Sequence, residues 1–207
     1  MEKLLQGIIE FRNNDFEDHK ELFVTLGKEQ KPHTLFIGCS DSRIVPNLIT
    51  KTLPGEIFVI RNIANLVPPF RNSNDYLATT SAIEFAVLSL EIENIIICGH
   101  SNCGGCLSLY QSDEKLSKLP HTKKWLEIAK NVKDIVLSMP DSNNIAKREW
   151  MTEQVNIVEQ MKNLLTFPFI KEKFIKKEIN ILGWYYIIET GEIFGYNMEK
   201  GLFELIN

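Results

Sequence analysis

The sequence has no long apolar run and no cluster of charge of one sign. Its 207 residues include 23 Lys and Arg against 27 Asp and Glu, for a formal net charge of -4 and a hydrophobic content of 44%. A chain without basic clusters is not expected to bind nucleic acid. Its apolar segments are also far shorter than the roughly 20 residues that cross a bilayer. We therefore expect an ordinary soluble globular protein with one well-buried core.

Signals for export and for duplication are also missing. The first twenty residues lack the apolar stretch and small-residue cleavage site of a secretory leader, and we find no repeat, low-complexity segment or linker. We therefore expect a cytoplasmic protein with a single domain over residues 1–207. There are only four cysteines. In a reducing compartment, so few favour metal binding or redox chemistry over a disulfide framework.

Apolar runs without alternation occur at 34–38, 57–60 and 94–99. Such runs are typical of strands buried on both faces of a parallel sheet. Residues 75–90 follow a helical period between the second and third runs, which indicates a strand-helix-strand unit. We expect further helices near 103–110, 121–138 and 146–166, broken at Pro120 and Pro140, then a strand at 178–188 and a turn at 190–192 into another strand.

The predicted fold is α/β, with a mostly parallel central sheet flanked by helices, an antiparallel edge strand and an N-terminal helical arm. The arm covers residues 1–31 and carries an apolar stripe that includes Leu4, Leu5 and Ile8. Because the arm precedes the first strand and has no partner of its own, we expect it to pack on a second subunit.

Two short motifs follow predicted strands. CSDSR occupies residues 39–43 and HSNCGG occupies residues 100–105. Ligands bind at the carboxyl ends of parallel strands, so Cys39, His100 and Cys103 could meet at one edge of the sheet. Two thiolates and one imidazole suit zinc, and a site with three protein ligands keeps one tetrahedral position open. The motifs therefore predict a catalytic zinc site.

Asp41 and Arg43 lie beside the first predicted ligand. A carboxylate there would compete for the open position on the metal. Arg43 can hold Asp41 away by a bidentate ion pair, leaving Asp41 as a hydrogen-bond acceptor beside that position. Gly104 and Gly105 allow two interpretations at this stage: tight packing, or backbone N–H groups that face the metal and receive an anion.

Three alternatives to a catalytic zinc site are compatible with these motifs. Cys103 and Cys106 form a C-x-x-C pair that could serve redox chemistry. A non-catalytic zinc domain would keep the ligands but would not need Asp41 or Arg43. A zinc hydrolase acting on carbonyl sulfide or carbon disulfide could keep the same ligand set. Cys98 lies within an apolar run, and we interpret it as part of the core.

Together the motifs resemble those of the β-class carbonic anhydrases, most closely the plant-like branch shared by many bacterial members. The likeness continues through PGE (54–56), FVIRNIAN (58–65), LVPP (66–69), SAIEFAV (81–87), NLLT (163–166) and GWYY (183–186). The resemblance implies reversible hydration of carbon dioxide to bicarbonate and a proton, with one Zn²⁺ per chain. It implies that Cys39, His100 and Cys103 bind this ion and that Asp41 and Arg43 form a catalytic dyad.

The resemblance also implies residues that contact substrate. By position, Gln30 matches a glutamine that hydrogen-bonds substrate, commonly across a dimer interface. Phe58 and Ile63 match the apolar wall that receives carbon dioxide, and Gly104 matches a backbone donor near bicarbonate. Phe85 stands where some members carry Tyr, so a phenolic contact is lost there. The resemblance further implies a homo-oligomer, either a dimer or a tetramer.

A regulatory bicarbonate pocket occurs in some members of the family, on a Trp, an Arg and a Tyr. Arg61 and Tyr186 match two of these positions, but Phe36 stands where the Trp would be. Phe lacks the indole N–H donor. We therefore expect no such bicarbonate pocket, and a dyad in which Asp41 stays paired with Arg43.

Overall fold

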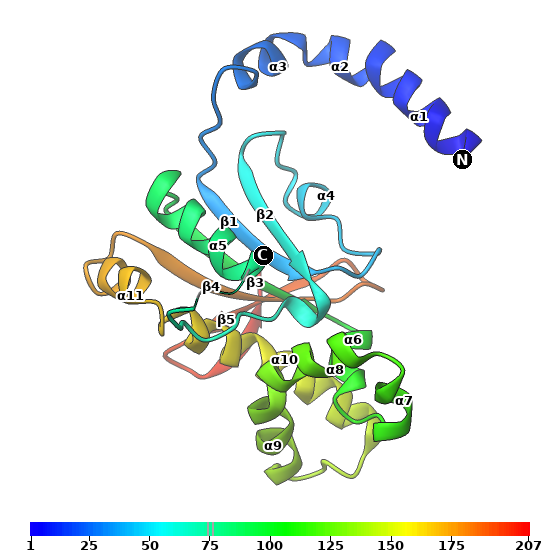
Figure 1. Ribbon diagram of the computed structural model, residues 1–207, viewed down its shortest axis with the longest axis vertical. Coiled ribbons are helices and arrows are strands. Elements are labelled where there is room, and N and C mark those ends of the chain that lie inside the picture. The colour runs from blue at the N-terminus through cyan, green and yellow to red at the C-terminus, as the bar shows by residue number, and fades with distance from the viewer. Residues whose placement is uncertain (74, 76) are drawn as a thin grey trace.

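The computed structural model describes residues 1–73, 75 and 77–207, and this described part contains a six-stranded sheet in the order β2-β1-β3-β4-β5-β6 (Figure 1). The first four strands in that order pair in parallel, β5 pairs antiparallel with β4, and β6 pairs antiparallel with β5. This confirms the predicted α/β fold, with two antiparallel pairings at one edge where a single antiparallel strand was expected. The strands are β1 (Thr34–Cys39), β2 (Ile57–Asn62), β3 (Asn94–His100), β4 (Asn180–Tyr186), β5 (Ile193–Asn197) and β6 (Leu202–Leu205).

The two central strands are buried, as their uninterrupted apolar runs predicted. Every residue of β1 is buried, and so is every residue of β3 after Asn94. Leu35 and Ile37 belong to the main core, which packs under the helices. Phe36 and Cys98 belong to a smaller cluster on the opposite face, so Cys98 is a core residue as expected.

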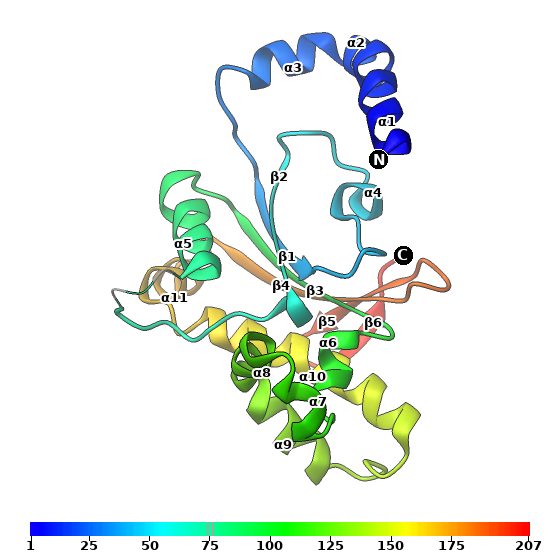
Figure 2. The ribbon, with the colours of Figure 1, turned by 45° about the vertical axis from the view of Figure 1, so that its right-hand side comes forward.

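The longest helix, α10 (Ile145–Leu164), packs against both β3 and β4 (Figure 2). Glycines make this close approach feasible. A Cβ at Gly99 would lie 2.8 Å from Ile157 Cδ1, and a Cβ at Gly183 would lie 2.6 Å from Met161 Sδ. Because α10 lies this close to the carboxyl half of β3, its first turns reach the edge of the sheet where the predicted metal ligands stand.

The remaining helices fill the connections, and several differ from expectation. The predicted helix at 75–90 is α5 followed by a single π-helical turn, while Tyr76 lies outside the described residues. Pro120 begins a helix instead of breaking one, because proline suits the first helical position. The elements that the sequence did not predict, namely α4, η1, α7, α11 and β6, are all short. The helices are α4 (Pro46–Thr50), η1 (Ile63–Asn65), α5 (Ala78–Glu84), η2 (Phe85–Ser89), α6 (Gly104–Ser108), α7 (Asp113–Ser117), α8 (Pro120–Leu126), η3 (Glu127–Ala129), α9 (Lys130–Ser138) and α11 (Pro168–Ile175).

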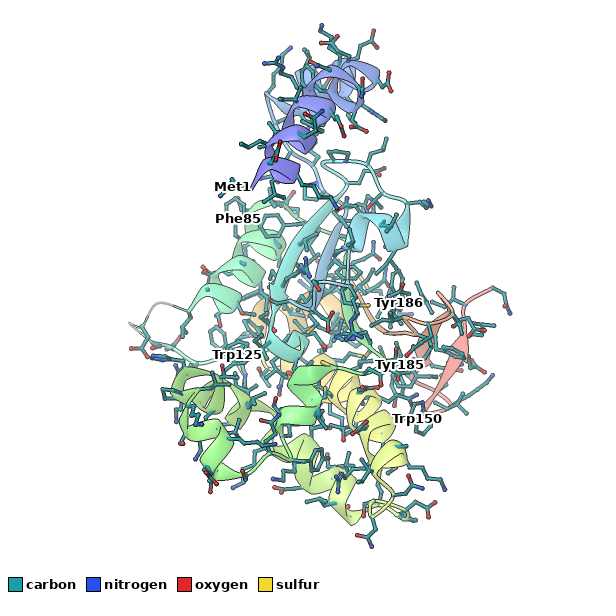
Figure 3. All side chains as sticks on the ribbon, turned by 90° about the vertical axis from the view of Figure 1, so that its right-hand side faces the viewer. Met1, Phe85, Trp125, Trp150, Tyr185 and Tyr186 are labelled. Carbon is teal, nitrogen blue, oxygen red and sulfur yellow. The ribbon has the colours of Figure 1, made fainter. Side chains whose placement is uncertain are left out.

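The N-terminal arm extends away from the sheet as α1 (Glu2–Asn13), α2 (Asp15–Asp18) and α3 (Lys20–Leu26) (Figures 1 and 3). The arm is thus helical to Leu26 and not to residue 31. The structure describes all three helices, and none of their residues is buried. An exposed apolar stripe is unfavourable in water. Since the single chain does not cover this stripe, the arm is suited to pack against another surface. No helix of the described residues is long and apolar enough to cross a membrane.

Candidate metal centre and active site

Three predicted ligands meet at the carboxyl ends of two neighbouring strands. Cys39 ends β1, His100 ends β3, and Cys103 stands directly before α6. Their ligand atoms all lie within 4.8 Å of one another. The two sulfur atoms are 3.9 Å apart. Two Zn–S bonds of about 2.3 Å at the tetrahedral angle separate the sulfurs by roughly 3.8 Å, so this pair fits zinc.

His100 presents a free nitrogen to the same site. Its Nδ1 lies 2.9 Å from the carbonyl oxygen of Ser101. A carbonyl can only accept, so Nδ1 carries the proton and Nε2 keeps its lone pair. Among the described residues, Nε2 is a buried nitrogen with no hydrogen-bond partner. A metal ion satisfies such an atom, which supports the fit of this donor set to zinc.

The thiols are hard to ionise in the absence of a cation. The hydrogen bond with Cys103, followed by burial, raises the pKa of Cys39 to about 12. The pKa of Cys103 is raised as well, first by its hydrogen bond with Cys106. All four cysteines of the chain are free thiols. A bound cation favours the thiolates, so we expect metal binding to release protons.

Asp41 and Arg43 form the bidentate pair that the sequence suggested. Arg43 Nε donates to Asp41 Oδ1 at 2.9 Å, and Nη2 donates to Oδ2 at 2.7 Å. The same Oδ2 lies 3.9 Å from His100 Nε2, beside the ligand cluster. The hydrogen bond from Arg43 is the largest cause that holds the pKa of Asp41 well below its usual range. Asp41 therefore stays a carboxylate, which can only accept hydrogen bonds.

Arg61 secures the backbone of the same loop. Its Nε donates to the carbonyl oxygen of Cys39 at 3.0 Å, and its Nη2 donates to that of Asp41 at 2.6 Å. Arg61 comes from β2, whose register places it opposite Gly38. One side chain thus ties Cys39, the first predicted ligand, and Asp41 to the neighbouring strand.

The predicted apolar wall lies partly at the surface. The rings of Phe58 and Phe85 are 6.1 Å apart, so these two positions adjoin. Ile63 is 42% exposed and holds Trp125 through its carbonyl oxygen, which accepts from the indole nitrogen at 2.9 Å. Apolar side chains left open in this way can receive an apolar molecule or a second subunit.

The two glycines after Cys103 have different surroundings. A Cβ at Gly105 would lie 2.8 Å from Ala64 Cβ, so this glycine is required for packing. A Cβ at Gly104 would meet no atom of the described residues within 4 Å. The packing interpretation therefore applies to Gly105, whereas Gly104 faces open space.

Gln30 is not brought to this site within one chain. It lies between α3 and the first residue of β1, Thr34, whereas Cys39 ends that strand. A strand of this length separates its two ends by about 17 Å. Gln30 therefore stands at the opposite end of β1 from the ligand cluster.

Sequence reasoning missed Glu153, which contacts the backbone of the predicted ligand Cys103. This buried residue of α10 accepts from the backbone nitrogen of Cys103 at 2.9 Å and from the hydroxyl of Tyr185 at 2.7 Å. Burial is the largest cause that raises the pKa of Glu153. Its signal was available, because Glu153 shares the buried face of the helix with Ile157 and Leu164. An acidic residue on an apolar helix face indicates a buried polar contact.

A large cavity among the described residues is separate from this cluster. It has a volume of about 740 Å³ and lies between α9, α10 and the antiparallel strands. Trp150 and Tyr185 line it, and both are labelled in Figure 3. Its lining includes none of the predicted site residues.

Comparison with known proteins gives one consistent family. The family model described as carbonic anhydrase matches residues 34–193. A carbonic anhydrase of Helicobacter pylori is 46% identical over 203 residues, which is 97% of this chain and 92% of that protein. A carbonic anhydrase of Synechococcus elongatus is 37% identical over 93% of this chain and 70% of that protein.

Solved structures agree with the sequence matches. The β-carbonic anhydrase CcaA superposes with a TM-score of 0.93 at 36% identity, covering 100% of this chain and 99% of that one. A structure described among two tetrameric β-carbonic anhydrases of Sordaria macrospora has a TM-score of 0.78 at 29% identity, covering 93% and 94% of the two chains.

Proposed function

This chain belongs to the carbonic anhydrase family, within its β class, and we propose that it uses Cys39, His100 and Cys103 to hold one zinc ion. Its activity is the zinc-dependent, reversible hydration of carbon dioxide to bicarbonate and a proton. The observation that carries this assignment is the convergence of the three ligand atoms beside the Asp41–Arg43 pair in a chain of this family. Zinc in such a site supplies Lewis acidity and lowers the pKa of water.

Asp41 orients the reactants because its carboxylate can only accept hydrogen bonds. A carboxylate accepts hydrogen bonds and donates none, so it favours a group that carries a proton beside Oδ2. The Arg43 guanidinium donates a hydrogen bond to each carboxylate oxygen, which keeps the carboxylate from rotating toward the ligands. We propose that this arrangement leaves the open metal position to the reactants.

The predicted apolar wall suits an apolar substrate. Within one chain only Ile63 follows the carboxyl end of β2, whereas Phe58 pairs with Leu35, four residues before Cys39. Phe58, Phe85 and Ile63 offer no hydrogen bonds from their side chains, so carbon dioxide does not displace polar contacts when it binds there. We propose that Gly104, at the first position of α6, offers its backbone N–H to the bicarbonate product. Its lack of a side chain keeps that approach open.

We propose that the active protein is a homo-oligomer, either a dimer or a tetramer. The uncovered apolar stripe of α1 supports this, since a second copy can bury it. A two-fold arrangement that swaps the arms also offers Gln30 a route to the partner's site. We further propose that residues 1–207 form one domain and that the protein is cytoplasmic. Its four free thiols, two of them in the metal cluster, support a reducing compartment.

A stopped-flow carbon dioxide hydration assay, with zinc analysis of the same sample, tests this function. We expect rapid turnover with close to one zinc per chain. Carbonyl sulfide and carbon disulfide, offered in parallel, should be poor substrates. Turnover of either sulfur compound without hydration of carbon dioxide would reject the assignment, and so would hydration that persists after the zinc is removed.

A further inference from the structure

Glu189 clamps the loop that joins two of the proposed metal ligands. It lies just beyond the end of β4, at the turn into β5. Its Oε2 accepts from the hydroxyl of Ser101 at 2.9 Å, and its Oε1 accepts from the side-chain amide of Asn102 at 2.6 Å. The Ser101 hydroxyl also accepts from the backbone nitrogen of Ile188 at 3.0 Å. Both carboxylate oxygens of Glu189 are thus engaged by consecutive residues of one loop.

The clamped loop has a backbone conformation that needs support. Asn102 has a φ of 55°, in the left-handed region that residues other than glycine seldom adopt. Asn is among the side chains that tolerate this region. The residue stands between His100 and Cys103, so its conformation sets how these two ligands face each other. The Glu189 contact holds the Asn102 side chain at this point of the chain.

The same loop reaches the catalytic pair. The carbonyl oxygen of Asn102 accepts from Arg43 Nη2 at 3.1 Å. That nitrogen also donates to Asp41 Oδ2 at 2.7 Å. A continuous set of hydrogen bonds therefore runs from Glu189 through Asn102 and Arg43 to Asp41. It joins the turn after β4, the loop after β3 and the loop after β1.

We propose that Glu189 is a positioning residue for carbon dioxide hydration, which acts by holding the Asn102 carbonyl where it fixes the Arg43 guanidinium on Asp41. This inference rests on the proposed function. Two contacts orient Arg43 Nη2, and the carboxylate is only one of them. When the Asn102 carbonyl moves, Arg43 keeps its charge. Its guanidinium loses the second hydrogen-bond acceptor that fixes the orientation of its plane. Asp41 is then free to turn out of the position in which it faces the reactants.

The test compares Glu189→Ala and Glu189→Gln with Glu192→Ala. Gln keeps one oxygen to accept from Asn102 and gains an amide that can donate to the Ser101 hydroxyl. Glu192 lies in the same turn, and among the described residues its carboxylate accepts a hydrogen bond only from the Thr190 hydroxyl. At equal zinc content we expect E189A to lower kcat about tenfold, which corresponds to about 1.4 kcal/mol of activation free energy. KM should change less than about twofold, and E189Q and E192A should both stay within about twofold of the wild type.

A second variant separates the Asn102 side chain from its backbone conformation. Asn102→Gly keeps the left-handed conformation without strain but removes the amide that Glu189 holds. We expect N102G to lower kcat as E189A does, and the double variant to be no worse than either single one. Additive losses would overturn the proposal, because they would mean that the two residues act separately.

Hydrogen exchange at the Arg43 Nε–H, followed by NMR, gives a readout that does not depend on turnover. We expect exchange to be several-fold faster in E189A and unchanged in E189Q. If wild-type protein did not hydrate carbon dioxide, the proposed function would fail while this measurement still tested Glu189. Unchanged exchange and unchanged kcat in E189A would overturn the positioning role. Loss of zinc from E189A in step with its activity would also overturn it, since the clamp would then serve metal retention.

Discussion

Both carboxylate oxygens of Asp41 accept hydrogen bonds from the guanidinium of Arg43, at 2.9 and 2.7 Å. Bidentate pairs of this kind are stronger and more directional than the average surface ion pair. Arg43 is also held by the carbonyl oxygen of Asn102 at 3.1 Å. The carboxylate beside the metal ligands is thus oriented by a cation that is itself oriented by the second ligand loop.

This pairing predicts a specific dependence of stability on pH. Arg43 lowers the pKa of Asp41 in the folded protein, so the pair contributes stability above the ordinary pKa of about 3.9, which is lost as the pH falls through the folded value. Arg43→Gln removes this contribution. We expect the difference in free energy of unfolding between wild type and R43Q to be largest near pH 6 and to shrink below pH ~4. Urea denaturation of both proteins at each pH measures it, and a constant difference would contradict the linkage.

The proposed ligand set predicts the result of removing each of its three side chains. Replacing Cys39, His100 or Cys103 by Ala should abolish zinc binding and hydration together. Cys106→Ser is the matched control, because Cys106 is a buried thiol next to Cys103 but is not a member of the ligand cluster. It should retain one zinc and most of the activity. If activity instead followed the formation of a Cys103–Cys106 disulfide, the redox interpretation would replace the zinc one.

The exposed arm predicts an effect on assembly. Deleting residues 1–24 removes the apolar stripe of α1, which has no contact within the described chain that buries it. We expect monomers or aggregates by light scattering. Ile8→Asp is a milder variant that should weaken association without shortening the chain, because a charge replaces an exposed apolar contact. A soluble, fully active truncated monomer would contradict the arm's role and would remove the case for Gln30 acting across an interface.

The environment of Phe36 predicts simple inhibition by bicarbonate. Phe36 is fully buried against Trp184, with ring centroids 6.4 Å apart, and offers no hydrogen-bond donor. Arg61 already donates to two backbone carbonyls of the metal-site loop. We therefore expect hyperbolic product inhibition, measured by carbon dioxide hydration at increasing bicarbonate. Sigmoidal inhibition that disappears in an Arg61 variant would show that a regulatory anion pocket exists after all.

The buried contact of Glu153 predicts a large difference between two similar substitutions. Glu153→Leu leaves the backbone nitrogen of Cys103 and the hydroxyl of Tyr185 without an acceptor, which should cost about 3 kcal/mol of folding free energy. Glu153→Gln keeps an oxygen for Cys103, and its amide can donate to the Tyr185 hydroxyl, so the cost should be below about 1 kcal/mol. Chemical denaturation of the two variants decides this, and equal losses would show that the hydrogen bonds contribute little.

The sequence by itself was enough to predict the candidate metal ligands and the strands that carry them. Cys39 and His100 each follow an uninterrupted apolar run, and such runs become buried parallel strands that end at one edge of a sheet. The choice of Cys, His and Cys limited the metal to a soft ion, because ligand preference is a property of the side chains themselves. The sequence pattern could not predict the short elements, because β6 and α7 have too few residues to show a periodic spacing of apolar side chains.

Only the tertiary structure decided how these ligands are supported. The tautomer of His100 depends on the Ser101 carbonyl, and Cys103 is held by Glu153, which lies 50 positions away. Glu189 meets Asn102 across a separation of 87 positions. Such contacts form because packing brings distant segments together, and no local periodicity records them. The exposure of the arm is likewise a result of the tertiary structure, because no part of the folded chain packs against α1 closely enough to bury its residues.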